Sequence, residues 1–272
     1  MTRRTVAIGL LIVAVSLAAA WALAYPQGAL TGPLVRTLAD ITEVGTIGLA
    51  AVPLLDTARF RPELARSAAG LLAVCSAGWL LAELVRLSVV AAQATAIPGG
   101  RIGLHTVTEF AAYTTVGRSG LLSVFAALGV CMAALFIPRT TPTTVATVGL
   151  AAAGLAARTL AGHLSENPIG GMAVAVHALA AAVWCGVLAA LVLTVTHRGQ
   201  WARVLPRFSQ LALVCVAVLL VAGVASALVR LGAPAELWAT GYGRLLAAKV
   251  VTTAGLLVLA WWNRENWLPD AR

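Results

Sequence analysis

Charge is what this sequence has least of. Only 11% of its 272 residues are Asp, Glu, Lys or Arg, whereas 60% are hydrophobic and the mean hydropathy is +0.92. Soluble domains carry about a quarter charged residues, so this chain has too few polar side chains to cover a sizeable surface in water. The shortage excludes a large soluble domain and indicates an all-α integral membrane protein whose main partner is the lipid bilayer.

Lysine is almost missing as well. Lys249 is the only lysine among 19 basic residues, and the net charge of +9 therefore rests on arginines. Nucleic-acid binding needs basic residues gathered in a surface stripe, but most of these arginines flank apolar runs. The charge pattern therefore predicts no nucleic-acid partner.

Paired cysteines and catalytic motifs are absent. The four cysteines lie inside apolar runs and no two form a CxxC, which excludes a disulfide framework or a zinc site of the usual spacing. They are Cys75, Cys131, Cys185 and Cys215. The chain also lacks a nucleophile–base arrangement, a phosphate-binding glycine loop and a zincin motif. We therefore expect that the protein is not an enzyme.

Long apolar runs are what the sequence does have. Each is long enough to cross a bilayer, which takes about 20 residues per helix. They predict about eight helices, near 5–25, 39–58, 66–92, 116–137, 143–162, 170–196, 208–230 and 244–262. The first run could instead be a signal peptide, because Arg3 and Arg4 precede it and Ala22-Leu23-Ala24 resembles a cleavage site. Its apolar stretch is longer than a usual signal core, which favours a retained helix.

The arginines near the helix ends predict the orientation. With the N-terminus inside, eleven arginines lie on the inner side and five on the outer side. Because cytoplasmic loops carry the excess of basic residues, this bias predicts a multi-pass membrane protein with both termini in the cytoplasm.

Two short motifs recur in the same order in the two halves of the chain. Leu84-Val85-Arg86-Leu87 and Leu228-Val229-Arg230-Leu231 each end a predicted helix, and Thr114-x-x-Gly117-Arg118 and Thr240-x-x-Gly243-Arg244 each open the next. This order is consistent with two parallel four-helix repeats, 1–138 and 139–272, of the kind found in some transporters. The repeat predicts Arg86 and Arg230 at equivalent places near the outer headgroups.

The outer side carries further polar residues. Asp40 and Glu43 lie near the outer end of the second predicted helix, where they could pair with Arg36 or line an entry path. The longest outer connection contains Thr106-Val107-Thr108-Glu109, a pattern that fits a capping box opening a short helix.

His163 and His177 are the strongest candidates for a metal-binding or cofactor-binding site. His163 lies in the short outer turn between the fifth and sixth predicted helices, and His177 lies about 10 Å into the sixth. The two imidazoles could face one pocket, with Met172, Glu166 or His105 as a further ligand. Imidazole and thioether ligands suit copper, whereas two facing histidines could also bind haem. Two separate polar residues, one of them hydrogen-bonded between helices, are the plainer reading.

The same histidines stand in a run of residues that resembles a known family. Gly162-His163 is followed by Ala175-Val176-His177-Ala178-Leu179-Ala180-Ala181-Ala182-Val183-Trp184-x-Gly186, and later by Arg207-Phe208-Ser209 and Thr240-Gly241-Tyr242-Gly243-Arg244-Leu245-Leu246-x-x-Lys249. Together and in this order they resemble the copper resistance D (CopD-like) membrane proteins over about 160–264. The first half is similar only in helix count and in the weaker Thr-x-x-Gly-Arg motif.

The resemblance implies an inner-membrane protein of copper transport or delivery that captures copper ions at the outer face through His163 and His177. It also implies a periplasmic copper-binding partner. Cys185 departs from the family, where small or aliphatic residues are commoner at this position. Related actinobacterial chains fuse such a half to a cytochrome oxidase assembly module resembling CtaG, so the chain could be a complete CopD-like protein or the front half of such a fusion. A haem-binding electron-transfer protein and a ligand-free oxidase-assembly subunit are the alternatives.

Overall fold

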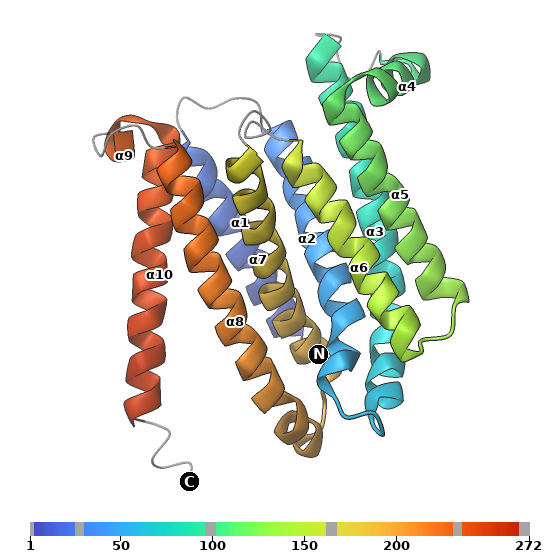
Figure 1. Ribbon diagram of the computed structural model, residues 1–272, viewed down its shortest axis with the longest axis vertical. Helices are drawn as coiled ribbons and strands as arrows, with labels where there is room; N and C mark the ends of the chain where they lie inside the picture. The colour runs from blue at the N-terminus through green and yellow to red at the C-terminus, as the bar shows by residue number, and fades with distance from the viewer. Residues whose placement is uncertain (1–2, 25–29, 96–101, 162–167, 231–235, 267–272) are drawn as a thin grey trace. The chain divides into compact units, whose positions relative to one another are not determined.

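The structure is a computed structural model of residues 1–272 (Figure 1), and it describes residues 3–24, 30–95, 102–161, 168–230 and 236–266. These segments are helical almost throughout and contain no β-strand. The elements in chain order are α1 (Arg3–Leu23), α2 (Thr31–Ala51), the 3-10 turn η1 (Val52–Leu55), α3 (Arg61–Thr95), α4 (Leu104–Tyr113), α5 (Thr115–Phe136), α6 (Thr141–Leu160), α7 (Pro168–Thr194), α8 (Arg198–Arg230), α9 (Glu236–Ala239) and α10 (Gly241–Asn266). The all-α prediction is confirmed.

Six of the described helices are long and apolar enough to cross a membrane. These spans are Thr31–Leu55, Arg61–Thr95, Thr115–Phe136, Thr141–Leu160, Gly170–Thr194 and Arg198–Val229. Helix α1 contributes a shorter apolar segment, Leu11–Leu23. The structure thus supports a multi-pass membrane protein, and the exact number of eight crossings stays a prediction.

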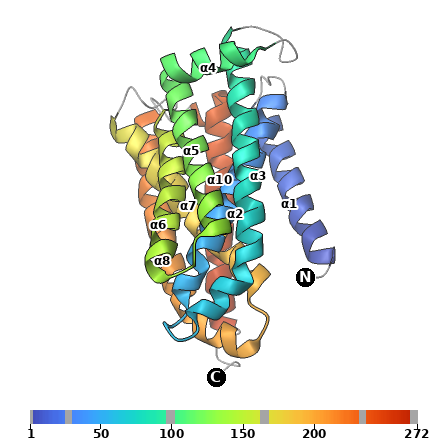
Figure 2. The ribbon, with the colours of Figure 1, turned by 90° about the vertical axis from the view of Figure 1, so that its right-hand side faces the viewer.

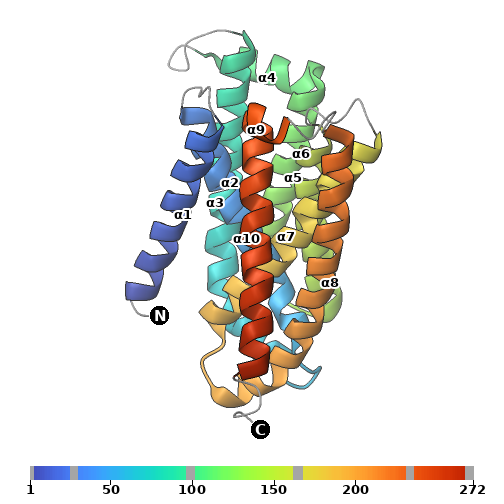
Figure 3. The ribbon, with the colours of Figure 1, turned by 90° about the vertical axis from the view of Figure 1, so that its left-hand side faces the viewer.

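Two compact units make up the chain. The smaller unit consists of Met1–Ala29 and Ala227–Arg272, and the larger one consists of Leu30–Ser226. In the smaller unit α1 packs against α10, and the Arg244 Nε donates a hydrogen bond to the Leu23 carbonyl over 3.2 Å. Figure 3 shows the short α9 at one end of α10, with which it is in contact.

The larger unit is organised around α2, which packs against α3, α6 and α7. Helices α3, α5 and α6 lie side by side on one side of the unit (Figure 2). A central apolar layer joins all of these helices, and its larger members are Ile47, Trp79, Val130 and Leu155. A second apolar cluster, which includes Leu64, Leu72, Leu191 and Val204, lies toward the end of the unit where η1 is found.

Helices α2 and α7 touch backbone to backbone. A Cβ atom added to Gly48 would lie 1.9 Å from the Gly186 carbonyl oxygen, and one added to Gly186 would lie 2.3 Å from the Val44 oxygen. Only glycine permits so close an approach, and small residues at such crossings are typical of membrane helices. These two glycines therefore fix where α7 meets α2.

The two copies of the Thr-x-x-Gly-Arg motif adopt the same local structure. The Thr114 hydroxyl accepts a hydrogen bond from the Gly117 backbone N–H over 2.9 Å, and the Arg118 Nε reaches back to the Ala112 carbonyl over 2.7 Å. In the second copy the Gly243 N–H bonds to the Thr240 hydroxyl over 2.9 Å. There the Arg244 Nη1 reaches back to the Trp238 carbonyl over 3.3 Å.

The motif is therefore a corner between a short helix and a long one, with threonine as the N-cap residue. In the first copy a Cβ on Gly117 would lie 2.1 Å from the Phe110 carbonyl oxygen, which explains the glycine. The two parallel repeats stay a prediction, because the shared corner is a local feature.

The capping box expected at Thr106–Glu109 is wrong. Helix α4 already begins at Leu104, after Gly103 as its N-cap residue. The Thr108 hydroxyl donates to the His105 carbonyl inside the helix, over 2.8 Å. A capping box does open α6, where Thr140 and Thr143 bond to each other's backbone N–H groups.

Candidate functional site

His177 lies on α7 and faces α8. Its Nδ1 is 3.1 Å from the Leu219 carbonyl oxygen, and a Cβ atom on Gly223 would lie 3.5 Å from the imidazole ring. Because Gly223 carries no side chain, the ring lies directly against the α8 backbone, where it is partly buried. The plainer sequence interpretation, a histidine hydrogen-bonded between helices, describes this contact correctly.

The hydrogen bond also determines the tautomer of His177. A carbonyl oxygen can only accept, so Nδ1 must be the protonated nitrogen and the lone pair of the neutral ring is on Nε2. Histidines that bind metal ions commonly donate their other N–H to a carbonyl or carboxylate in this way, which orients the ring. The helix contact and a ligand role are therefore compatible.

The structure does not bring Met172 or His105 to His177. Met172 lies five residues earlier on α7, about 140° around the helix, and its side chain is 63% exposed. His105 lies on α4, which packs against α3 and α5, and its Nδ1 is 3.3 Å from the Glu109 carboxylate. His163 and Glu166 lie outside the described residues. Within the part of the chain that the structure describes, no group of three or more His, Cys, Asp or Glu side chains could hold one metal ion.

A buried network of charged side chains joins α2, α3 and α6 in the half of the larger unit away from η1. Arg158 is its centre, with a side chain only 11% exposed. Its Nη2 contacts the carboxylates of Asp40 and Glu43, the latter at 2.7 Å, and its Nη1 lies 3.4 Å from Glu83 Oε2. One guanidinium thus serves three carboxylates from two other helices.

A second arginine completes this network. The Arg86 Nε donates to Glu83 Oε1 over 2.9 Å, and its Nη2 contacts the same oxygen. The side chains of Glu43 and Glu83 are wholly buried, and that of Arg86 is 13% exposed. Asp40 lies at the edge of the network, where it is 45% exposed and 3.9 Å from the exposed Arg36.

Sequence reasoning anticipated this network only in part. The pairing of Asp40 with Arg36 is confirmed, but Arg86 is buried against Glu83 instead of reaching the headgroups. The sequence does contain evidence for the network, because Glu83, Arg86 and Arg158 all lie inside apolar runs. Ionisable residues in such runs indicate a functional role or a charged partner. What the sequence lacks is the information that α6 lies beside α2.

The other end of the larger unit is held by arginines. Asp56 is fully buried and accepts two hydrogen bonds of 3.2 Å from Arg203, whose guanidinium also lies 4.0 Å from the Phe60 ring centroid. Arg207 Nη1 donates to the Leu55 carbonyl over 3.0 Å. Arginines near a helix C-terminus satisfy its last carbonyls and complement its dipole.

Arg139 and Arg61 make further contacts at the same end of the larger unit. Arg139 Nη2 donates to the Leu49 and Ala50 carbonyls over 3.4 and 3.3 Å, and Arg61 Nη1 donates to the Thr141 hydroxyl over 2.9 Å. Burial lowers the pKa of the Arg139 guanidinium from its ordinary value. Four of the arginines that the sequence assigns to the cytoplasmic side, Arg61, Arg139, Arg203 and Arg207, therefore gather at one end of this unit.

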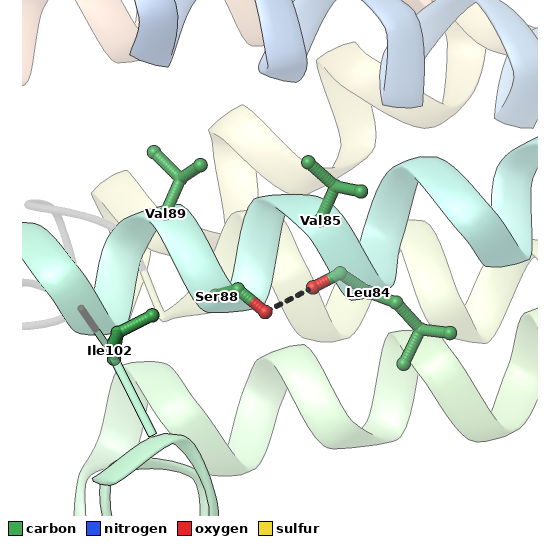
Figure 4. Close-up of a pocket in the computed structure, with 5 residues that line it drawn as sticks. All are labelled: Leu84, Val85, Ser88, Val89 and Ile102. Carbon is green, nitrogen blue, oxygen red and sulfur yellow. Dashed lines mark hydrogen bonds between the residues drawn. The ribbon is translucent and has the colours of Figure 1, made fainter. Parts of the chain in front are cut away.

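One cavity is an apolar groove of α3 formed by Leu84, Val85, Ser88 and Val89, with Ile102 across from them (Figure 4). The Ser88 hydroxyl is the polar group of this groove, and it bonds to the Leu84 carbonyl of its own helix over 3.0 Å. Such a groove has no group suited to a metal ion.

Two family models match the chain. Residues 28–174 match the N-terminal domain of copper resistance protein D-like proteins, and residues 202–272 match copper resistance protein D. Neither a curated protein nor a solved structure gives a significant match. The first match contains the whole charge network and extends the resemblance to the first half of the chain. His177 lies between the two matched ranges.

Proposed function

The chain belongs to the copper resistance protein D family, and from that premise we propose that it transports copper across the bacterial inner membrane or delivers copper at its outer face. The family supports a role in copper handling, and the six apolar helices support a multi-pass membrane protein. Copper is the cargo in this proposal, and the protein performs no covalent chemistry.

His177 is the residue that we propose as a copper ligand, together with His163. The observation that carries this proposal is the bond between Nδ1 and the Leu219 carbonyl. The bond orients the ring against the backbone of α8, as the hydrogen bond from the other ring nitrogen commonly does in metal-binding histidines. Neutral imidazole is a frequent ligand of copper.

A partner protein supplies further ligands in this proposal. The described residues hold no group of three His, Cys, Asp or Glu side chains that could bind one metal ion, and copper bound by His177 needs more than one ligand. A periplasmic copper-binding protein, or an oxidase-assembly partner that receives the ion, would complete the coordination during transfer. This favours delivery and transfer over storage of the ion.

The test is copper binding by the full chain purified in mild detergent. We expect bound copper without a Soret band, and His177→Ala should weaken copper binding at least tenfold without loss of folded protein. His197→Ala is the matched control, because His197 lies beside the arginine-rich end of α8 and should leave copper binding unchanged. A Soret band that His177→Ala abolishes would favour the haem-binding alternative. Equal copper binding by His177→Ala and wild type would remove His177 from the site.

The arginine-rich end supports the proposed orientation, with both termini in the cytoplasm. Contacts from Arg61, Arg139, Arg203 and Arg207 place the α2–α3 connection, the α5–α6 connection and the start of α8 at one end of the larger unit (Figure 1). An excess of arginine at one end is typical of the cytoplasmic side.

A further inference from the structure

The buried network has more negative than positive charges. Asp40, Glu43 and Glu83 supply three carboxyl groups, whereas Arg86 and Arg158 supply two guanidinium groups. Arg36 is 76% exposed and lies 3.9 Å from Asp40, so solvent and headgroups screen its contribution. If these three carboxyl groups and two guanidinium groups were all ionised, the network would carry one uncompensated negative charge. In a medium of low dielectric constant such a charge is strongly unfavourable.

Glu43 is the least satisfied of the three carboxyl groups. Its side chain is wholly buried, and neither oxygen has a hydrogen bond in the structure. The Arg158 guanidinium is 2.7 Å from Oε2 but lacks the alignment of a hydrogen bond. Glu83, by contrast, accepts from both arginines, and Asp40 accepts from Arg158 and is partly exposed. A buried carboxylate without hydrogen bonds is the costliest of the three to ionise.

We propose that Glu43 is a proton-binding site, loaded with a proton from the outer aqueous phase through Asp40. Proton binding converts the Glu43 carboxylate to a neutral carboxylic acid, and the network then carries no net charge. Release of the proton to the outer phase restores the carboxylate, so that the step involves no other reactant.

The surroundings of Glu43 define the direction of access. The charged groups around it are Arg36 and Asp40 on its own helix, Glu83 and Arg86 on α3, and Arg158 on α6. Helix α7 also packs against α2, and its described titratable side chains are His177, which contacts α8, and Cys185. On the other side, one turn further along each helix, Ile47, Trp79 and Leu155 form the central apolar layer. A proton therefore reaches Glu43 from the Asp40 side.

Two further buried polar atoms lie on α3 and α5 of the same unit. Trp79 Nε1 and Ser123 Oγ are inaccessible to solvent, and neither has a hydrogen-bond partner in the structure. Trp79 lies one helical turn from Glu83 on α3. Unpaired polar atoms in a protein interior are rare, and Trp79 Nε1, which can only donate a hydrogen bond, adds such an atom to the region around Glu83. This proposal goes beyond copper handling and does not depend on it.

The test is infrared spectroscopy of the full chain in lipid bilayers, titrated over about pH 5 to 10, because buried glutamates can stay protonated above neutral pH. The C=O stretch of a protonated, buried carboxyl group should be present at the acidic end and should disappear as the pH rises. Glu43→Gln should abolish this signal. Glu109→Gln is the matched control, because Glu109 is 57% exposed on α4 and should leave the signal unchanged.

A second variant tests the charge count without altering Glu43. Asp40→Asn removes one negative charge, so the remaining Glu43, Glu83, Arg86 and Arg158 are balanced when ionised. The signal should then appear only at a lower pH than in wild type. Absence of the signal in wild type, its survival in Glu43→Gln, or an identical titration in Asp40→Asn would each overturn the proposal.

Discussion

Replacing Gly48 by alanine tests the backbone contact between α2 and α7. The new Cβ would lie 1.9 Å from the Gly186 oxygen, whereas ordinary van der Waals contact begins at 3.4 Å. The helices must therefore separate locally by about 1.5 Å (3.4 − 1.9). Because the obstructing atom is backbone, no side-chain rotation can relieve the clash.

The magnitude follows from two opposing effects. Overpacking a well-packed interior costs about 1–3 kcal/mol, and a clash with backbone belongs at the upper end of that range. Alanine in place of a helical glycine returns up to about 1 kcal/mol. We therefore expect Gly48→Ala to lower the free energy of unfolding by about 2 kcal/mol, which corresponds to roughly 4–8 °C in Tm for a chain of this size.

Gly149→Ala is the matched control for this experiment. Gly149 is also helical, on α6, but no atom lies within 4 Å of its added Cβ. Without a clash, the helix-propensity gain of about 0.5–1 kcal/mol should raise the Tm slightly. The assay is thermal unfolding of both variants and wild type in the same detergent. A Gly48→Ala protein as stable as Gly149→Ala would refute the backbone contact.

Two further predictions concern charge. Arg158→Gln should destabilise the protein by about 3–5 kcal/mol, because it leaves buried carboxylates without their shared cation. Arg36→Gln, at an exposed position, should change the stability by less than about 0.5 kcal/mol. Chemical unfolding in detergent measures both changes. Cysteines introduced for labelling near Arg59 and Arg198 should react only from the cytoplasmic side, and one introduced near Asn167 only from outside; outward labelling at Arg198 would contradict the orientation.

The helices were largely predictable from the sequence, because apolar runs of sufficient length have few alternatives in a bilayer. The largest boundary difference concerns α8, which begins at Arg198 instead of near 208. The sequence predicts 197–207 to be a connection between two helices. In the structure Arg203 and Arg207 lie on a helical extension, held there by Asp56 and the Leu55 carbonyl.

The sequence identified individual residues of the candidate site but not the contacts between them. His177 stands out as an ionisable residue in an apolar run, but nothing in the sequence identifies Leu219 on α8 as its partner. Likewise, Asp40 and Arg158 are 118 positions apart, and their contact depends on α6 packing against α2. Pairs within one helix were readable in principle, since Glu83 and Arg86 follow the i, i+3 spacing of helical neighbours.

The scarcity of lysine has a structural counterpart in Arg158. Its guanidinium is a flat, rigid group whose Nη1 and Nη2 face carboxylates of different helices, and a lysine ammonium, being a single point charge, has no such plane. The spacing of α2, α3 and α6 at this level is therefore fixed by the dimensions of one planar group. In the apolar layer one turn away, the spacing is instead fixed by the volumes of side chains such as Ile47 and Leu155. The distances between these three helices are thus set by a rigid guanidinium group at the level of Arg158. One turn away, they are set by apolar side chains whose packing can adjust.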